Sequence, residues 1–319
     1  MNIRPHANPL TAQPSSRRLG RRGFLGLAAA GVAAGIVGCG TNSGVGTVRL
    51  GSGEPGGFYN AFARLLAEVA DQAGTVRIDP IDTYGSRTNL TMLVRGEVDA
   101  ALALVDSIEG GEQVLALGRV YENYLQLAVR VDSPIRRVAD LRGTRVNLGA
   151  VGSGAALTGE RLLWAAGFEP GVDVTVEHRG LRDAVAALDA GEVDALLWAG
   201  GVPTGALAVP RLRLLDLDEL AAPLRGRFGH VYDRVQIPAD AYPGGSAVHT
   251  IGVANLLLAA PSLPDAAAAA IVDLLLSRAD ALVPAEAAGT QFLDARSLTG
   301  TGSIALHPGA AEVYRRHHG

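Results

Sequence analysis

The order of apolar and polar positions predicts strands that alternate with amphipathic helices. An apolar strand at 47–50 leads into a glycine-rich stretch, and a helix over 60–72 follows with apolar residues at helical spacing. A second strand is expected at 76–79. A short helix then ends at Gly96, and the apolar run at 98–105 is typical of a buried parallel strand. These elements predict one α/β unit.

The same order recurs in the second half of the chain. The pentapeptide Gly-Glu-Val-Asp-Ala stands at 96–100 and again at 191–195, each time about 40 residues after a Gly-Ser-Gly loop. In each copy the glycine is expected to end a helix in the left-handed conformation, so that the chain turns directly into a strand. Chance is the alternative, because all five residues are common. The matching offsets favour two equivalent α/β lobes.

Alternating strands and helices predict mainly parallel sheets, whose ligands bind beyond the carboxyl ends of the strands. In this chain those ends carry the glycine loops. The stretches 125–131 and 251–259 are expected to connect the lobes, and an alanine-rich helix over 265–282 returns to the first lobe. We therefore expect a two-lobed α/β fold with a ligand cleft between the lobes. The predicted boundaries are 47–131 with 250–319 for lobe 1, and 132–249 for lobe 2.

The N-terminus has the pattern of an export signal. Arg21 and Arg22 precede Phe-Leu, as in a twin-arginine signal, and the apolar run 25–37 is too short to cross a bilayer. Ile-Val-Gly-Cys, ending at Cys39, resembles a bacterial lipobox, in which the cysteine is acylated; a free thiol in a turn is the alternative. The sequence predicts a signal peptide at 1–38, a tether at 39–46, and a lipid anchor on the outer face of the cytoplasmic membrane.

Charge and cysteine content exclude several classes of function. Beyond residue 38 the chain has 23 arginines against 32 acidic residues, a net charge of −9 with no long basic run, which argues against a nucleic-acid partner. Cys39 is the single cysteine, so no disulfide and no cysteine-based metal site can form within the chain.

An ordered set of motifs resembles the TAXI subfamily of substrate-binding proteins, the extracytoplasmic components of certain TRAP transporters. The segments that carry the resemblance are 50–59, Gly85-Ser86 with Asn89, 132–134 with 140–143, 149–154, 191–195, 201–204, 237–238 with 242–244, and 307–310. The resemblance implies a type II periplasmic-binding fold, no cofactor, a monomer, and delivery of a small carboxylated solute, such as glutamate or a 2-oxoacid, to a membrane permease.

The first lobe supplies most of the candidate ligand-binding residues. Glycine turns expose backbone N–H groups at a helix N-terminus, which suits a carboxylate or a phosphate. For Phe58 the alternative is packing in the core, and for Ser86 the alternative is capping a helix. Asp106 is proposed to accept a hydrogen bond from a ligand ammonium group, with a solvated loop acid as the alternative. The candidates are Gly53, Gly56, Gly57, Phe58, Tyr59, Ser86, Arg87 (which departs from the family pattern and is placed to clamp a distal carboxylate), Asn89 and Asp106.

The second lobe supplies fewer candidates. Ser153 offers a hydroxyl and Gly154 a backbone amide, although Ala155 replaces the threonine usual in the TAXI pattern. The remaining candidates are expected to face the cleft from the strand through Trp198 and from a later loop. They are Pro203, Thr204 and Tyr242.

Catalysis is not expected, because the chain has no nucleophile elbow, no H-E-x-x-H motif and no histidine spacing that assembles a metal. The rival interpretation is an exported Rossmann-type NAD(P)-dependent oxidoreductase. The segment 51–56 fits G-x-G-x-x-G, and Asp79 follows 23 residues after Gly56. A ligand-sensing module for a receptor is a third class. The expected mechanism is closure of two lobes on one solute, which a continuous sheet with no gap between halves would contradict.

Overall fold

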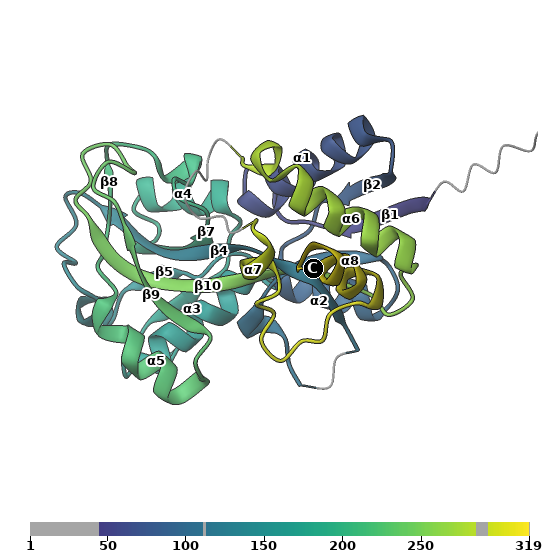
Figure 1. The fold of residues 1–319 in the computed structure, drawn as a ribbon. Coiled ribbons are helices and arrows are strands. Elements are labelled where there is room, and N and C mark those ends of the chain that lie inside the picture. The colour runs from purple at the N-terminus through teal and green to yellow at the C-terminus, as the bar shows by residue number, and fades with distance from the viewer. Residues whose placement is uncertain (1–44, 111–112, 285–292, 319) are drawn as a thin grey trace, which may run out of the picture. The chain divides into compact units, whose positions relative to one another are not determined.

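Two copies of one strand–helix unit form the two ends of the sheet (Figure 1). The computed structural model describes residues 45–110, 113–284 and 293–318. The first copy consists of β1 (Val45–Gly51), α1 (Phe58–Ala73), β2 (Val76–Ile81), α2 (Ser86–Val94) and β3 (Ala100–Leu104). The second copy consists of β5 (Arg145–Asn147), α3 (Gly154–Ala165), β6 (Thr175–Glu177), α4 (Leu181–Asp189) and β7 (Ala195–Gly200).

In both copies the first strand lies between the other two. Strand β1 pairs in parallel with β2 and β3, and β5 pairs in parallel with β6 and β7. The predicted repeat is therefore confirmed, with small differences at the element ends. Strand β1 begins at Val45, inside the segment predicted as a tether, because Val45 already pairs with Val76 of β2. The predicted signal peptide and Cys39 lie outside the described residues.

Two long antiparallel strands join the copies. Strands β4 (Leu115–Arg130) and β10 (Val248–Ala259) pair with each other, β10 also pairs with β3, and β4 also pairs with β7. The resulting strand order is β2-β1-β3-β10-β4-β7-β5-β6, so the hydrogen-bonded ladder is continuous through the described residues. The predicted connecting stretches 125–131 and 251–259 fall largely within these two strands. The ladder alone does not decide whether a gap separates the halves, which depends on the loops described below.

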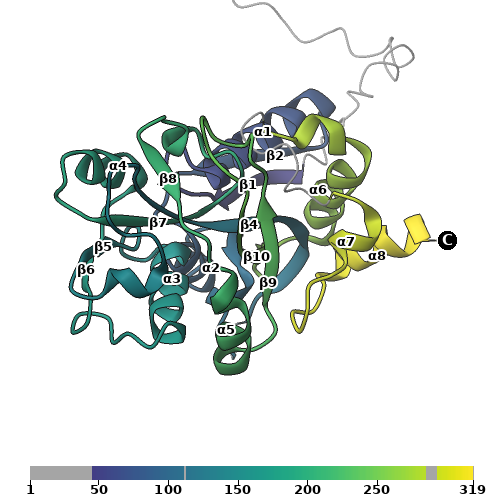
Figure 2. The same ribbon diagram turned by 90° about the vertical axis from the view of Figure 1, so that its left-hand side faces the viewer.

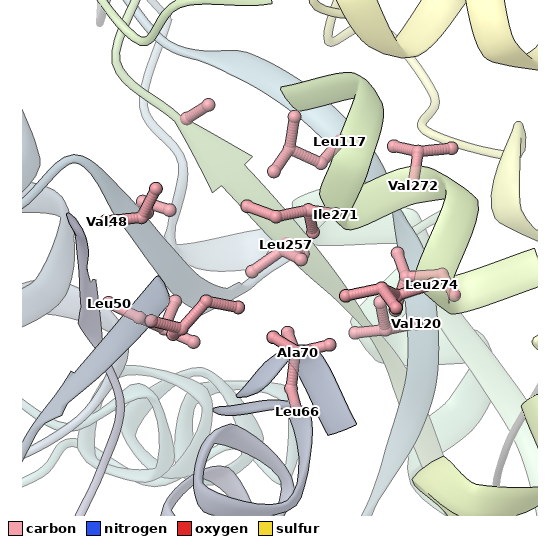
Figure 3. Packing of buried hydrophobic residues seen from close by; sticks show 14 of the residues in the cluster. Val48, Leu50, Leu66, Ala70, Leu117, Val120, Leu257, Ile271, Val272 and Leu274 are labelled. Atoms are coloured by element: carbon pink, nitrogen blue, oxygen red, sulfur yellow. The ribbon is translucent and has the colours of Figure 1, made fainter. Parts of the chain in front are cut away.

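The first copy and the C-terminal helices together form the first half of the structure. Its main core lies between α1, the sheet and these helices. Leu66 and Ala70 of α1 face Leu257 of β10 and Ile271 of α6 (Asp265–Ser277), as Figure 3 shows. Helix α8 (Pro308–His318) packs beside α6, and α7 (Ala295–Leu298) lies next to α8 (Figure 2). The single helix predicted for 265–282 is two elements, because the backbone leaves helical angles at Arg278 and resumes as a 3₁₀ turn over Ala279–Leu282.

The second half has a core of its own, in which α3 and α5 (Ala221–Phe228) pack against the sheet. Strand β9 (Tyr232–Ile237) pairs with β10 and β8 (Leu212–Leu214) pairs with β4, both antiparallel. Short 3₁₀ turns connect the larger elements at Val105–Ser107, Val138–Leu141, Gly205–Leu207 and Asp218–Leu220. Among the described helices, none combines the length and apolarity that a bilayer span requires.

The repeated pentapeptide has a mechanical role in each copy. Gly96 and Gly191 end α2 and α4 with φ of +70° and +71°, a conformation that glycine adopts without a steric penalty. The aspartate three residues later accepts hydrogen bonds from both the backbone N–H and the guanidinium of an arginine on the first strand of the same copy. These pairs are Arg49 with Asp99 and Arg145 with Asp194. In addition, each arginine donates to the carbonyl of the glycine, at 3.0 Å for Gly96 and 2.8 Å for Gly191.

Candidate functional site

A cavity of about 40 Å³ lies where the loops of the two halves meet. One wall comes from the loop between β1 and α1 and the start of α2, and the opposite wall from the start of α3 and from β7. A gap therefore does separate the halves at this point, although β4 and β10 connect them below it. Seven of the residues predicted to bind ligand line this cavity: Gly53, Gly57, Phe58, Tyr59, Ser86, Ser153 and Gly154.

Three helices begin at the cavity. Helix α1 starts after Gly57, α2 after Gly85 and α3 after Ser153, and each of these three capping residues lines the cavity. Neither Gly57 nor Gly85 has a side chain to cap its helix, whereas the Ser153 hydroxyl accepts a hydrogen bond from the backbone N–H of Ala156 at 3.1 Å. Since helix N-termini carry partial positive charge and free N–H groups, their convergence favours an anionic group in the cavity.

Close approach of the halves depends on Gly154. A β-carbon at this position would lie 2.6 Å from Leu104 Cδ1 and 2.6 Å from Ser86 Oγ, distances that real side chains do not tolerate. Gly154 is the first residue of α3, whereas Ser86 is the first residue of α2. The absence of a side chain at Gly154 thus lets the N-termini of two helices from different halves come together.

A buried hydrogen-bond network forms the first wall. The Tyr59 hydroxyl donates to Asn255 Oδ1 and lies 3.1 Å from Ser86 Oγ, and Ser86 Oγ accepts the backbone N–H of Leu104 at 3.0 Å. Burial raises the pKa of Tyr59, so this hydroxyl stays protonated. Phe58 packs edge-on against Tyr121 with ring centroids 4.0 Å apart. Phe58 therefore belongs both to the cavity wall and to the core, the two roles that the sequence left open.

Several polar atoms of the lining residues have no hydrogen-bond partner among the described residues. They are Asn123 Oδ1, Trp198 Nε1 and Glu54 Oε1, all buried. Leaving a buried polar atom unpaired is unfavourable, so such atoms mark positions where a bound molecule can supply the missing partner. The sequence did not predict these three as ligand-binding residues, nor Tyr84, Gly85, Leu104, Ala155 and Ala199 of the same lining.

Beside the cavity the two halves touch through reciprocal contacts. Glu54, from the β1–α1 loop, accepts a hydrogen bond at its Oε2 from the backbone N–H of Leu181, the first residue of α4, at 2.9 Å. In the opposite direction, Gly152 of the β5–α3 loop accepts at its carbonyl oxygen the backbone N–H of Thr88 in α2, at 3.0 Å. Each glycine loop thus satisfies a free N–H in the first turn of a helix of the other half.

Arg87 and Asn89 lie outside the cavity lining. Arg87 forms an ion pair with Glu109 at the surface. Asn89 is fully buried and donates its side-chain amide to three carbonyl oxygens, those of Gly51 at 3.2 Å, Ser52 at 2.7 Å and Leu102 at 2.7 Å. Asn89 therefore ties α2 to the end of β1 and to the middle of β3.

Asp106 also lies outside the cavity lining. Its carboxylate is completely buried and accepts hydrogen bonds from Thr158 at 2.8 Å and Tyr232 at 3.0 Å, with the Arg161 guanidinium 3.7 Å away. Burial raises the pKa of Asp106, while the hydrogen bond from Thr158 and the charge of Arg161 oppose that shift. With Ser107 Oγ, which donates to Asp106 Oδ1 at 3.4 Å, the carboxylate has four partners within the protein, and it holds the end of β3 against α3 and β9.

The remaining predicted residues line two other hollows. Gly56, Pro203 and Thr204 surround a second hollow of about 60 Å³ next to the cavity. Tyr242 lines a third hollow; its hydroxyl accepts the backbone N–H of Thr204 at 2.7 Å and donates to Gln126. Asp79, the acid of the possible dinucleotide fingerprint, is exposed on β2 and does not line the cavity. Among the described residues no group of three or more potential metal ligands occurs.

Two α/β halves, joined by two strands and facing each other across a cavity built from helix N-termini, define a periplasmic-binding-protein fold of type II. A family model described as the NMT1-like family matches residues 50–317, and the chain belongs to this family of solute-binding proteins. The coarse prediction of a solute-binding protein agrees with this family. The match does not identify the TAXI subfamily.

Two solved structures with TM-scores above 0.5 support the fold. A protein of Bordetella bronchiseptica RB50 superposes with a TM-score of 0.55 at 14% identity, covering 86% of this chain and 98% of that one. A protein assigned as an L-cystine ABC transporter, from Listeria monocytogenes, gives a TM-score of 0.51 at 15% identity and covers 78% of this chain and 100% of that one. The periplasmic aliphatic sulphonate binding protein SsuA from Escherichia coli matches at 18% identity and a TM-score of 0.44, covering 85% and 83%.

Proposed function

We propose that this protein is the extracytoplasmic component of a TRAP-type transporter and captures a small carboxylated solute between its halves. The observation that carries the proposal is the convergence of three helix N-termini, two from one half and one from the other, on a single cavity. Free N–H groups at such termini hold a carboxylate without an arginine. The ordered motifs that resemble the TAXI subfamily support the TRAP assignment.

The proposed mechanism is closure of two lobes, residues 47–131 with 250–319 and residues 132–249. In an open form the reciprocal contacts of Glu54 and Gly152 are broken, and each lobe exposes its helix N-termini to water. A solute that contacts both lobes shifts the population to the closed form, in which these contacts reform. The permease then recognises the closed form and receives the solute. Asn123 and Trp198 offer the solute further hydrogen-bonding groups.

The proposed location is the outer face of the cytoplasmic membrane. Arg21 and Arg22 begin the export signal, and acylation of Cys39 anchors the mature protein beside its permease. Metabolic labelling with a radioactive fatty acid tests the anchor. We expect the wild-type protein to be labelled and the Cys39→Ser variant to be unlabelled; equal labelling of both proteins contradicts the lipobox assignment.

The solute class is tested by thermal denaturation of the full-length protein with a panel of ligands. A bound ligand raises Tm because it stabilises only the folded state. We expect at least one small carboxylate to raise Tm, and the same ligand to fail with Gly154→Ala at matched concentration. A rise with NAD(P) and with no carboxylate supports the oxidoreductase interpretation instead, and a rise with sulfonates alone shifts the solute class.

A further inference from the structure

The charge of the cavity is unusual for an anion site. None of its lining residues is an arginine or a histidine, and Glu54 is the single carboxylate among them. A carboxylate held by helix N-termini therefore lies near a fixed negative charge and near no positive side chain of the lining. A ligand with a second carboxylate is repelled there, whereas a ligand with a positive group is attracted.

Glu54 is held in one position by its contact with the opposite half. Its Oε2 binds the N-terminus of α4, and Gly180 leaves the space for it, because a β-carbon on Gly180 would lie only 2.7 Å from that oxygen. Its Oε1 is buried and has no hydrogen-bond partner among the described residues. One oxygen is thus committed to the protein, and the other remains able to accept a hydrogen bond.

The surroundings of Glu54 favour a positive neighbour. Burial raises the pKa of this carboxyl, the backbone N–H of Leu181 lowers it, and the negative charge of Asp183 raises it again. Burial and the charge of Asp183 thus disfavour the ionised form of Glu54, and the hydrogen bond from Leu181 favours it. A cationic group at Oε1 supplies the compensation that the lining residues do not.

We propose that Glu54 is a specificity-determining residue that accepts a hydrogen bond from an ammonium group of the solute, so that the preferred ligand is an α-amino acid. This inference rests on the proposed function, which places the carboxylate of the same molecule at the helix N-termini. It transfers to Glu54 the role that the sequence suggested for Asp106. Because Glu54 also binds α4, an amino acid held by Glu54 is coupled directly to closure of the cavity.

Matched pairs of ligands test the inference in the wild-type protein. L-Glutamate and 2-oxoglutarate share their skeleton and differ in the ammonium and oxo groups, as do L-alanine and pyruvate. By isothermal titration calorimetry we expect the amino acid of at least one pair to bind at least tenfold more tightly than its oxoacid. Equal affinity or a preference for the oxoacid overturns the inference but leaves the proposed function standing. If no carboxylate binds at all, both the inference and the proposed function are wrong.

Two variants separate specificity from closure. Glu54→Gln keeps an oxygen for Leu181 but loses the negative charge. We expect this variant to lower the affinity for the amino acid by a factor at least ten times larger than for the matching oxoacid. Gly152→Ala is the control, because its β-carbon would lie 2.7 Å from Thr88 Oγ1 and its φ is +83°. This change hinders closure without altering the charge and should weaken both ligands of a pair equally. An unchanged preference in Glu54→Gln contradicts the role of Glu54; should that variant not fold, the wild-type ligand pairs still decide.

Discussion

The glycine loops of the two halves both lead into a helix N-terminus, but they differ in chemistry. Gly53 and Gly56 of the first loop have counterparts 96 positions later in Gly149 and Gly152, and Gly56 and Gly152 share a positive φ of +86° and +83°. The residues between and after these glycines differ. The first loop carries Glu54, Gly57, Phe58 and Tyr59 where the second carries Ala150, Ser153, Gly154 and Ala155.

This difference shows a division of labour within a repeated scaffold. The loop of the first half supplies charge, two aromatic side chains and a hydroxyl network, whereas the loop of the second half supplies a small surface that can approach closely. Strand pairing and the arginine–aspartate pairs are common to both halves and hold the sheet together in each. The cavity residues are not under that constraint, so they are free to differ and to define the ligand.

The largest test of this comparison is at Asp106, whose counterpart in the second half is Gly201. Asp106→Ala removes the buried carboxylate that accepts from Thr158 and Tyr232 and lies 3.7 Å from the Arg161 guanidinium. Removing one partner of such a buried group costs about 3 kcal/mol, which lowers Tm by roughly 6–10 °C in a protein of this size. Differential scanning calorimetry measures the change. The ratio of amino-acid to oxoacid affinity should stay as in the wild type; a changed ratio returns Asp106 to the ligand site.

The second test addresses the small surface of the second half. Gly154→Ala places a methyl group against Ser86 and Leu104, and overpacking of this kind costs about 1–3 kcal/mol. We expect solute affinity to fall about 10- to 100-fold. Gly226→Ala on α5 is the matched control, because a β-carbon there has no neighbour within 4 Å. If both variants bind the solute like the wild type, close approach at Gly154 is not required.

The third test removes the hydroxyl that the second half lacks. Tyr59→Phe deletes the donor to Asn255 and the contact with Ser86 in a buried site, at an expected cost of about 1 kcal/mol in the free energy of unfolding. Denaturant titration measures it. Tyr84→Phe serves as control, since Tyr84 is 61% exposed. Equal stability of the two variants means that the network at Tyr59 contributes nothing to folding.

The smallest effect concerns the shared arginine–aspartate pairs. The guanidinium contacts of Arg49 to Asp99 measure 2.7 and 3.0 Å, against 3.3 Å for both contacts of Arg145 to Asp194. Asp99→Asn should therefore lower Tm slightly more than Asp194→Asn. A larger loss in Asp194→Asn contradicts the ranking by distance.

The same pair predicts a dependence on pH. The hydrogen bond from Arg49 lowers the pKa of Asp99 below its usual value. Its stabilisation is thus complete above the unfolded pKa of about 3.9 and is lost as pH falls through the lowered value. Below pH 4, the Tm difference between wild type and Asp99→Asn should shrink. A difference that stays constant in acid rules out this contribution.

The sequence predicted what local patterns determine. The glycine turns, the helix ends at Gly96 and Gly191 and the repeated unit depend on residues near one another in the chain, and the structure contains them. Asn89 and Asp106 show the limit: both are polar residues at strand or helix ends, and only long-range packing decides whether they face a ligand or the protein. Asp106 is buried by Tyr232, which lies 126 residues away.

The cavity lining was only partly predictable for the same reason. Glu54 stood within a recognised motif, yet its role depends on Leu181, 127 residues later. Asn123 and Trp198 lie in mainly apolar strands. A polar atom in such a strand, with no partner close by, was the available sign of a ligand-binding residue. Such a signal says that a residue needs a partner but does not say whether the partner is protein or ligand.

The position of β10 in the sheet has a consequence for biosynthesis. This strand lies between β3 and β4, and α6 and α8 cover the core of the first half, yet all three elements follow the second half in the chain. A nascent chain therefore exposes the edge of β3 and an uncovered apolar face until β10, α6 and α8 have left the ribosome. The half that is synthesised first is therefore the last to complete its fold, and its exposed apolar surface needs shielding by a chaperone for the longest time.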